Sequence, residues 1–328
     1  MVSGQRVSLR RADGVAVSTL ADDVRKGFSQ PLRELPPKHF YDERGSELFE
    51  QICRLPEYYP TRVERSILER RAGDIARLTD ATELVELGAG TAAKTRVLLD
   101  ALRDHGTLAR YIPFDIDAGT LHRVAVSLAS EYPALQTVDC VAGDFERDLA
   151  LIPARHDGGR RVVAFLGGTI GNFDTQGRRR LLGSLVRQMD ARDRLLLGAD
   201  LVKDPAVLEA AYDDAAGVTA EFNRNILAVV NRELDADFPV QEFAHVAFYD
   251  QANEWIEMRL RATRAVTVTV RAVDMVFSFM PGDEIRTEIS AKFTPARLEA
   301  DLAESGLRVV ELMTDPAGLF ALVLARPA

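Results

Sequence analysis

Between residues 83 and 201, short apolar segments alternate with segments whose apolar residues recur at helical spacing. The apolar segments are 84–87, 111–115, 137–141, 161–166 and 194–197, and the amphipathic ones include 95–102, 118–131 and 178–189. Strands that alternate with helices are typical of a parallel sheet covered by helices. The pattern therefore predicts an α/β core in this part of the chain.

The pattern changes after residue 200. Residues 204–234 carry a helical apolar stripe, and 244–249, 255–261, 265–270, 273–279 and 286–293 are predicted to be antiparallel strands. A helix at 295–304 and strands at 307–313 and 319–324 follow. A parallel core that ends in a helix and an antiparallel pair is the layout of a class I (Rossmann-like) methyltransferase core. We predict this core at 63–200 and 287–328, with a discontinuous α+β substrate-binding domain at 1–62 and 201–286.

The N-terminal part gives weaker signals. Residues 1–19 alternate polar and apolar positions and are predicted to be a ragged strand or a tail. Helices are predicted at 21–28, 46–55 and 61–78. Thr61 and Glu64 have the spacing of a capping box at the start of the third.

A glycine turn follows the first core strand, with Gly88 and Gly90 one residue apart. Glycine lets a ligand approach the backbone, and the first N–H groups of the next helix point at the same place. A dinucleotide fingerprint has a third glycine where this chain has Ala93. The turn is either a plain tight turn or part of a site for a ligand without a pyrophosphate, such as S-adenosylmethionine.

Four further residues fit such a ligand, because ligands bind beyond the carboxyl ends of parallel strands. Asp115 is predicted to accept hydrogen bonds from ribose hydroxyls, Asp144 from the adenine amino group, and Phe145 to pack near the ring. Lys94 can reach a ligand carboxylate. The alternatives are helix or loop caps for the two aspartates and a solvated helix charge for Lys94.

Composition narrows the class of partner. A net charge of -9 and a pI near 5.2 argue against nucleic acid or a membrane surface. Two cysteines, no apolar leader and no long apolar run predict a cytoplasmic protein. None of the five histidines has a metal-like setting, so no metal is expected. The oligomeric state is left open, with a monomer as the expectation.

Several motifs resemble those of the L-histidine Nα-methyltransferases, which open ergothioneine biosynthesis. The resemblance spans the chain from about residue 22 to its end, and its motifs lie at 40–49, 55–62, 168–172, 200–204, 211–234 and 287–293. It implies three methyl transfers from S-adenosylmethionine to the α-amine of histidine, giving hercynine.

The resemblance also implies site residues. Gly88, Lys94, Asp115, Asp144 and Phe145 would hold the methyl donor. The residues that would hold histidine are Tyr58, Asn172, Tyr212, Met258, Glu288, Ile289 and Ser290. Tyr41 would lie beside the amine, as the candidate for removing its proton.

The chemistry of Glu288 and Ser290 can be assessed separately. They are two residues apart on a predicted strand, so both point to one face. The carboxylate can accept from one imidazole N–H, while the hydroxyl bonds the other nitrogen. The alternative is an edge strand with polar residues facing water. Alternatives exist for the other candidates as well. Tyr41, Tyr58 and Tyr212 could be half-buried packing residues, and Asn172 could be a turn former.

Three rival functions remain at this point. A related methyltransferase of another amino acid, such as a tryptophan derivative, would share the core. An NAD-dependent oxidoreductase fits the glycine turn but not the missing third glycine. A nucleoside-binding protein without catalysis would not require the tyrosine-rich segments.

Overall fold

The computed structural model describes residues 6–11, 19–156 and 158–328, so most of the predicted N-terminal strand or tail lies outside the described residues. The chain forms two compact units. The first comprises residues 1–17, 62–201 and 293–328, and the second comprises 18–61 and 202–292. This division differs from the predicted one at the N-terminus, where residues 7–11 join the core sheet, and near residue 287.

The first unit is built on an eight-stranded sheet. Its order is β1 (Val7–Arg11), β5 (Thr137–Ala142), β4 (Arg110–Asp115), β3 (Glu83–Leu87), β6 (Arg161–Phe165), β7 (Arg194–Asp200), β14 (Phe320–Pro327) and β13 (Leu307–Thr314). The first six strands are parallel, and β14 runs antiparallel to both of its neighbours. The predicted α/β class with a C-terminal antiparallel pair is confirmed.

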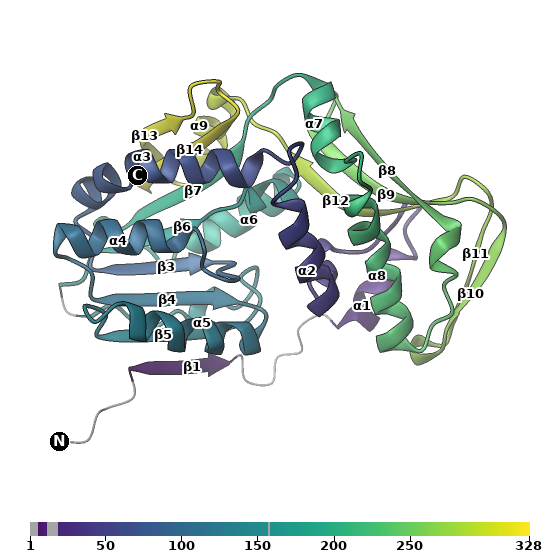
Figure 1. Ribbon diagram of the computed structural model, residues 1–328, viewed down its shortest axis with the longest axis horizontal. Coiled ribbons are helices and arrows are strands. Elements are labelled where there is room, and N and C mark those ends of the chain that lie inside the picture. Colours follow the sequence, from purple (N-terminus) through teal and green to yellow (C-terminus); the bar gives the residue numbers. More distant parts are fainter. Residues whose placement is uncertain (1–5, 12–18, 157) are drawn as a thin grey trace. The chain divides into compact units, whose positions relative to one another are not determined.

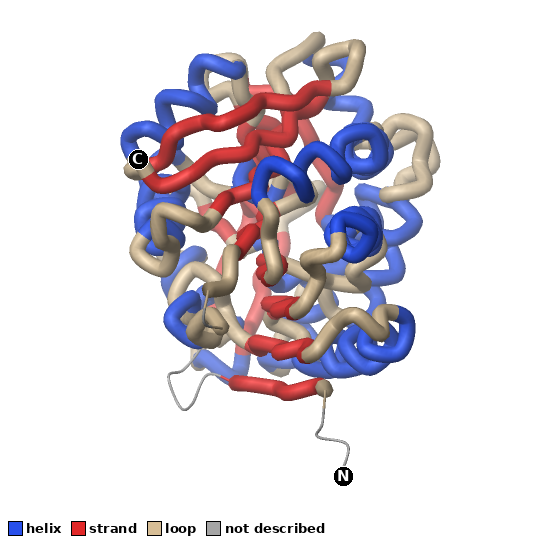
Figure 2. The backbone as a smooth tube through the Cα atoms, turned by 90° about the vertical axis from the view of Figure 1, so that its left-hand side faces the viewer, coloured by secondary structure: helices blue, strands red, loops and turns tan. Residues whose placement is uncertain are grey.

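Helices flank this sheet on both sides (Figure 2). They are α3 (Pro60–Thr79), α4 (Thr95–His105), α5 (Ala118–Glu131), α6 (Thr175–Val186) and α9 (Pro295–Glu304). Every residue of β3 and β6 is buried, as expected for central strands covered on both faces, and these strands are apolar apart from Glu83, Glu86 and Arg161. Because these strands are packed on both faces, their positions are well defined, and so are the starting points of the loops that follow them.

The second unit contains a four-stranded sheet in the order β2 (Arg33–Glu34), β12 (Glu284–Ala291), β9 (Trp255–Ala262) and β8 (Phe243–Asp250). A separate pair is formed by β10 (Val266–Val270) and β11 (Met275–Phe279). The helices are α1 (Leu20–Gly27), α2 (Glu43–Ile52), α7 (Pro205–Tyr212) and α8 (Val218–Leu234). In Figure 1, α7 and α8 lie beside β8 and β9, which both helices contact.

Short 3₁₀ turns complete the two units. They are η1 (Pro37–Phe40), η2 (Leu149–Leu151), η3 (Thr169–Asn172), η4 (Val240–Glu242) and η5 (Arg271–Val273). Over the described residues, no helix has the length and apolar character needed to cross a membrane.

Local polar contacts change two of the predicted helices. The segment 204–234 is two helices, because the Asp214 carboxylate accepts from the backbone N–H groups of Val218 and Thr219 and starts a new helix after Gly217. Helix α2 begins at Glu43 rather than Ser46, since the Asp42 side chain caps it.

The predicted capping box of α3 is wrong. The helix starts at Pro60, a residue favoured in the first helical turn. Glu64 is fully buried, and its carboxylate accepts from the backbone N–H of Gly167 at 2.8 and 3.0 Å. Glu64 therefore ties α3 to the loop after β6.

Candidate active site

The glycine turn after β3 leaves open space at the strand end. Gly88 and Gly90 have φ values of +71° and +49°, in the left-handed region where glycine is favoured. A Cβ built on either residue would meet no atom within 4 Å. The backbone N–H of Gly90 donates to Asp115 Oδ2 at 2.9 Å, which ties the turn to the end of β4. An open cradle at this point fits a bound nucleoside.

Asp115 and Asp144 both organise the loops in which they lie. The second oxygen of Asp115 accepts from the backbone N–H of Asp117 at 3.1 Å, and Asp144 Oδ1 accepts from that of Glu146 at 2.9 Å. Burial raises the pKa of Asp115, and the backbone hydrogen bonds oppose this rise. Each carboxylate has about four acceptor positions, so these contacts leave room for ligand hydrogen bonds.

Phe145 and Lys94 flank these loops. The Phe145 ring is half-buried and meets Phe165 edge to face, with centroids 5.4 Å apart. Lys94 pairs with Glu64, and only 21% of its side chain is exposed. Lys94 is therefore not a solvated helix charge.

Glu86 of β3 is a further carboxylate in this unit, and sequence reasoning missed it. It is buried and accepts hydrogen bonds from Thr95 Oγ1 and Tyr111 Oη, both at 2.5 Å. Burial raises its pKa to about 7, against these two hydrogen bonds. Because Thr95 starts α4, Glu86 joins the strand before the glycine turn to the helix after it.

The second unit brings aromatic side chains together from α2, the loop after it, α7 and α8. Tyr58 is buried, and its ring centroid lies 6.1 Å from that of Phe49 and 6.2 Å from that of Tyr212. The ring of Tyr41, which is 43% exposed, meets those of Phe49 and Phe222. We call Tyr41, Phe49, Tyr58, Tyr212 and Phe222 the aromatic cluster.

Electrostatic effects place Glu288 near this cluster. Burial raises the pKa of Tyr58 well above its ordinary value, and smaller contributions come from nearby Tyr212, Cys53, Tyr41 and Glu288. Predicted substrate residues from four separate segments therefore lie within one region of the second unit.

Strand β12 presents the polar part of this region. Glu288 pairs in register with Met258 of β9, so both side chains lie on the same face of the sheet, as does that of Ser290. Ile289 pairs with Glu257 and alternates to the opposite face. A contact between Ile289 and a ligand on the Glu288 face would therefore have to come from its backbone.

The carboxylate of Glu288 receives no hydrogen bond from any residue that the structure describes. Burial raises its pKa to about 7, and the charge of Lys292 opposes this rise. The residue is only partly buried. A poorly solvated carboxylate with unused lone pairs is suited to accept a hydrogen bond from a ligand.

Ser290 belongs to a triangle of polar groups. Its Oγ lies 2.8 Å from Tyr212 Oη, and the ammonium group of buried Lys292 donates to both oxygens, at 2.9 and 3.0 Å. The backbone carbonyl of Tyr212 lies 2.8 Å from His245 Nε2. Sequence reasoning missed Lys292, although it continues the two-residue spacing of Glu288 and Ser290.

Asn172 ends η3, in the first unit, and is half-buried. The predicted substrate residues are therefore divided between the two units, whereas the predicted donor residues all belong to the first.

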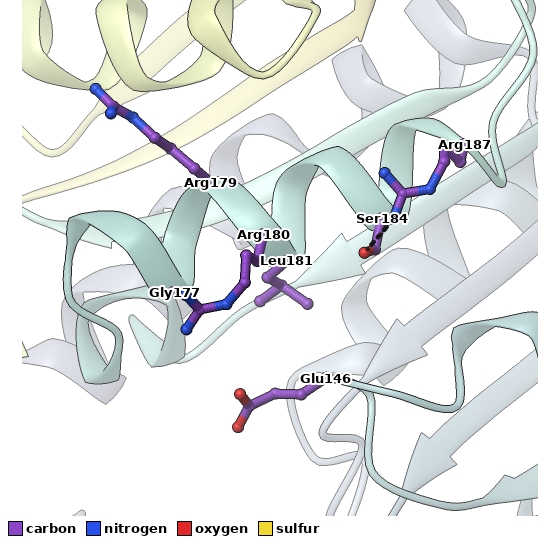
Figure 3. Close-up of a pocket in the computed structure, with 7 residues that line it drawn as sticks. All are labelled: Glu146, Gly177, Arg179, Arg180, Leu181, Ser184 and Arg187. Carbon is purple, nitrogen blue, oxygen red and sulfur yellow. Dashed lines mark hydrogen bonds between the residues drawn. The ribbon is translucent and has the colours of Figure 1, made fainter.

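A surface pocket of about 300 Å³ lies elsewhere, along α6 (Figure 3). It is lined by Glu146, Gly177, Arg179, Arg180, Leu181, Ser184 and Arg187, and none of these is a predicted site residue. Among the described residues, no group of three or more His, Cys, Asp or Glu side chains is arranged to hold a metal ion.

Comparison with known proteins gives a specific match. The sequence model of a family described as histidine-specific, S-adenosylmethionine-dependent methyltransferases matches residues 20–327. A histidine N-alpha-methyltransferase of Mycolicibacterium smegmatis is 53% identical over 94% of this chain and 95% of its own length. A histidine N-alpha-methyltransferase of Mycobacterium tuberculosis is 51% identical over 93% of this chain and 94% of its own length.

More distant similarities are also present. An L-tryptophan methyltransferase of Psilocybe serbica is 30% identical over 87% of this chain and 86% of its own length. Among solved structures, the CcbJ methyltransferase from Streptomyces caelestis is 14% identical, with a TM-score of 0.45 over 80% of this chain and 89% of its own. The family match over almost the whole chain decides the assignment: the protein belongs to the histidine-specific, S-adenosylmethionine-dependent methyltransferases.

Proposed function

We propose that the protein transfers three methyl groups from S-adenosylmethionine to the α-amine of L-histidine, forming hercynine at the start of ergothioneine biosynthesis. One observation carries the choice of substrate. Glu288, a carboxylate that no described residue hydrogen-bonds, lies two residues from the Ser290 hydroxyl on one face of β12. A neutral imidazole ring offers one N–H donor and one nitrogen acceptor, which this pair complements.

The first unit supplies the donor side in this proposal. S-adenosylmethionine, when bound, supplies an electrophilic methyl group on its sulfonium. Gly88 and Gly90 give the backbone clearance, and Asp115 and Asp144 retain acceptor positions for ribose and adenine groups. Lys94, which pairs with Glu64, is the cation that would bind the carboxylate of the ligand.

The second unit supplies the acceptor side. The α-amine must be neutral to attack, although near neutral pH much of it is protonated. Holding the deprotonated amine in place can supply much of the rate. Tyr41 is our candidate for helping to remove the proton: its hydroxyl oxygen accepts the proton of the amine while its own hydroxyl proton passes to water. As methyl groups accumulate, the amine becomes a bulky cation, which the ring faces of the aromatic cluster can accommodate.

The proposal is tested by incubating the purified protein with S-adenosylmethionine and an equimolar mixture of amino acids, followed by mass spectrometry. We expect histidine to gain one, two and finally three methyl groups while tryptophan, tyrosine and phenylalanine stay unmodified. Methylation of tryptophan in preference to histidine would establish the rival substrate. A product with fewer than three methyl groups at completion would overturn the trimethylation.

A further inference from the structure

Lys292 is a fully buried cation at the end of β12. Two of its protons go to hydroxyl oxygens, those of Tyr212 and Ser290, and its Nζ lies 4.7 Å from the centre of the Tyr212 ring. Burying an ammonium group is costly, and an apolar side chain of similar volume often gives equal or greater stability. The position of Lys292 therefore calls for a role besides packing.

The hydrogen bonds of Lys292 set the direction of two hydroxyl groups. An ammonium group has donors and no acceptor, so both oxygens must accept from it. The two oxygens are also 2.8 Å apart, which places one hydroxyl proton between them. The other hydroxyl proton must then point away from the triangle. In this way Lys292 makes the Tyr212–Ser290 pair a net donor of one hydrogen bond.

Lys292 also acts on Glu288 through its charge. Burial raises the pKa of Glu288 and Lys292 lowers it, and among the described residues Tyr58 also feels the charge of this carboxylate. Tyr41 and Tyr212 are in turn coupled to Tyr58. Tyrosines are neutral at physiological pH, so the ammonium group of Lys292 is the charge that favours the carboxylate form.

We propose that Lys292 is a specificity-determining positioning residue, which fixes the Tyr212–Ser290 hydroxyl pair as a donor and keeps Glu288 an acceptor. The Glu288 face of β12 then presents one donor and one acceptor, the complement of a neutral imidazole ring. An indole has a single N–H and no acceptor nitrogen, and a phenyl ring has neither, so both would leave buried polar groups unpaired. This inference rests on the proposed function, with histidine as substrate.

Two substitutions separate the two effects of Lys292. Lys292→Met removes the donors and the charge at similar volume, whereas Lys292→Gln keeps amide donors and loses the charge. Lys203→Met is a matched control, because Lys203 makes a similar pair with Tyr59, at 2.7 Å to its hydroxyl and 4.6 Å to its ring centre. Neither Lys203 nor Tyr59 is a predicted site residue.

The measurement is KM for histidine, KM for S-adenosylmethionine and the pH profile of kcat/KM. For Lys292→Met we expect KM for histidine to rise about tenfold or more, the KM for the donor to change less than about twofold, and the lower pH midpoint to move upward. For Lys292→Gln we expect a smaller rise in KM for histidine than for Lys292→Met, but the same upward shift of the lower pH midpoint. Lys203→Met should show neither change.

Unchanged KM and pH midpoint in both Lys292 variants would overturn the inference, as would equal effects in Lys203→Met. If Lys292→Met does not fold, the midpoint of Lys292→Gln decides the question alone. Failure of the proposed function is recognised separately, since the wild-type protein would then transfer no methyl group to histidine.

Discussion

The two units each contain a carboxylate on a strand whose pKa is raised to about 7 by burial: Glu86 on β3 and Glu288 on β12. Their surroundings differ. Glu86 accepts hydrogen bonds from Thr95 and Tyr111 within its own unit, whereas Glu288 accepts none from the described residues. Glu86 has partners supplied by the fold, and Glu288 has none among the described residues.

This difference shows why a raised pKa does not by itself identify a binding residue. Both carboxylates are poorly solvated, but Glu86 already accepts two hydrogen bonds from its own unit, whereas Glu288 accepts none from the described residues. The number of partners that the fold supplies separates a structural carboxylate from one available to a substrate.

The largest effect is expected for Glu288→Ala. Loss of a hydrogen bond to a charged group costs about 1.5–3 kcal/mol, so kcat/KM for histidine should fall about 100-fold, mainly through KM. Steady-state kinetics at pH 8 test this. The matched variant is Glu86→Gln, whose affinity for histidine, measured without the methyl donor, should stay within about twofold.

A variant with alanine at position 288 that still strongly prefers histidine over other amino acids would refute the role of this carboxylate.

A smaller effect is expected for Ser290→Ala. It removes one neutral hydroxyl, and a neutral hydrogen bond contributes about 1 kcal/mol, so KM for histidine should rise about five- to tenfold. Ser290→Thr keeps a hydroxyl and should retain more of the affinity. Equal KM values for the wild type and Ser290→Ala would show that the hydroxyl does not contact the substrate.

The smallest effect on substrate binding, but a clear effect on stability, is expected for Glu86→Gln. The folded-state pKa of Glu86 is raised from 4.5 to about 7, so its favourable contribution is complete below pH 4.5 and is lost as pH rises through 7. The unfolding free energy of the variant relative to the wild type should increase by up to about 3 kcal/mol between pH 5 and 8. Thermal melts across this range would contradict the account if the difference were constant.

The sequence alone predicts the order of the core elements, because the strands and helices of the first unit have strong and different periods. It also predicts that Glu288 and Ser290 share a face, since that follows from a two-residue repeat. Contacts between distant residues are not predictable in this way. Glu86 accepts a hydrogen bond from Tyr111, which is 25 residues away in the sequence, and Glu64 accepts one from Gly167, which is 103 residues away.

The missed role of Lys292 has a different cause. Its spacing from Ser290 places it on the same face, but a lysine at a strand end is usually exposed. Only the fold reveals that this one is buried against two hydroxyl groups.

The central claim is that Glu288 is an acceptor held ready for the substrate ring, and proton release on binding tests it most directly. Hercynine is a suitable ligand because its trimethylated amine cannot titrate. Calorimetry at pH 7 in buffers of different ionisation enthalpy should show about half a proton more released per hercynine bound by the wild type than by Glu288→Gln, since a group with pKa about 7 is half protonated there. The proton that leaves the imidazole ring itself is released in both proteins, and Glu86→Gln should release as much as the wild type. Release that is absent from the wild type, or unchanged in Glu288→Gln, would contradict the account.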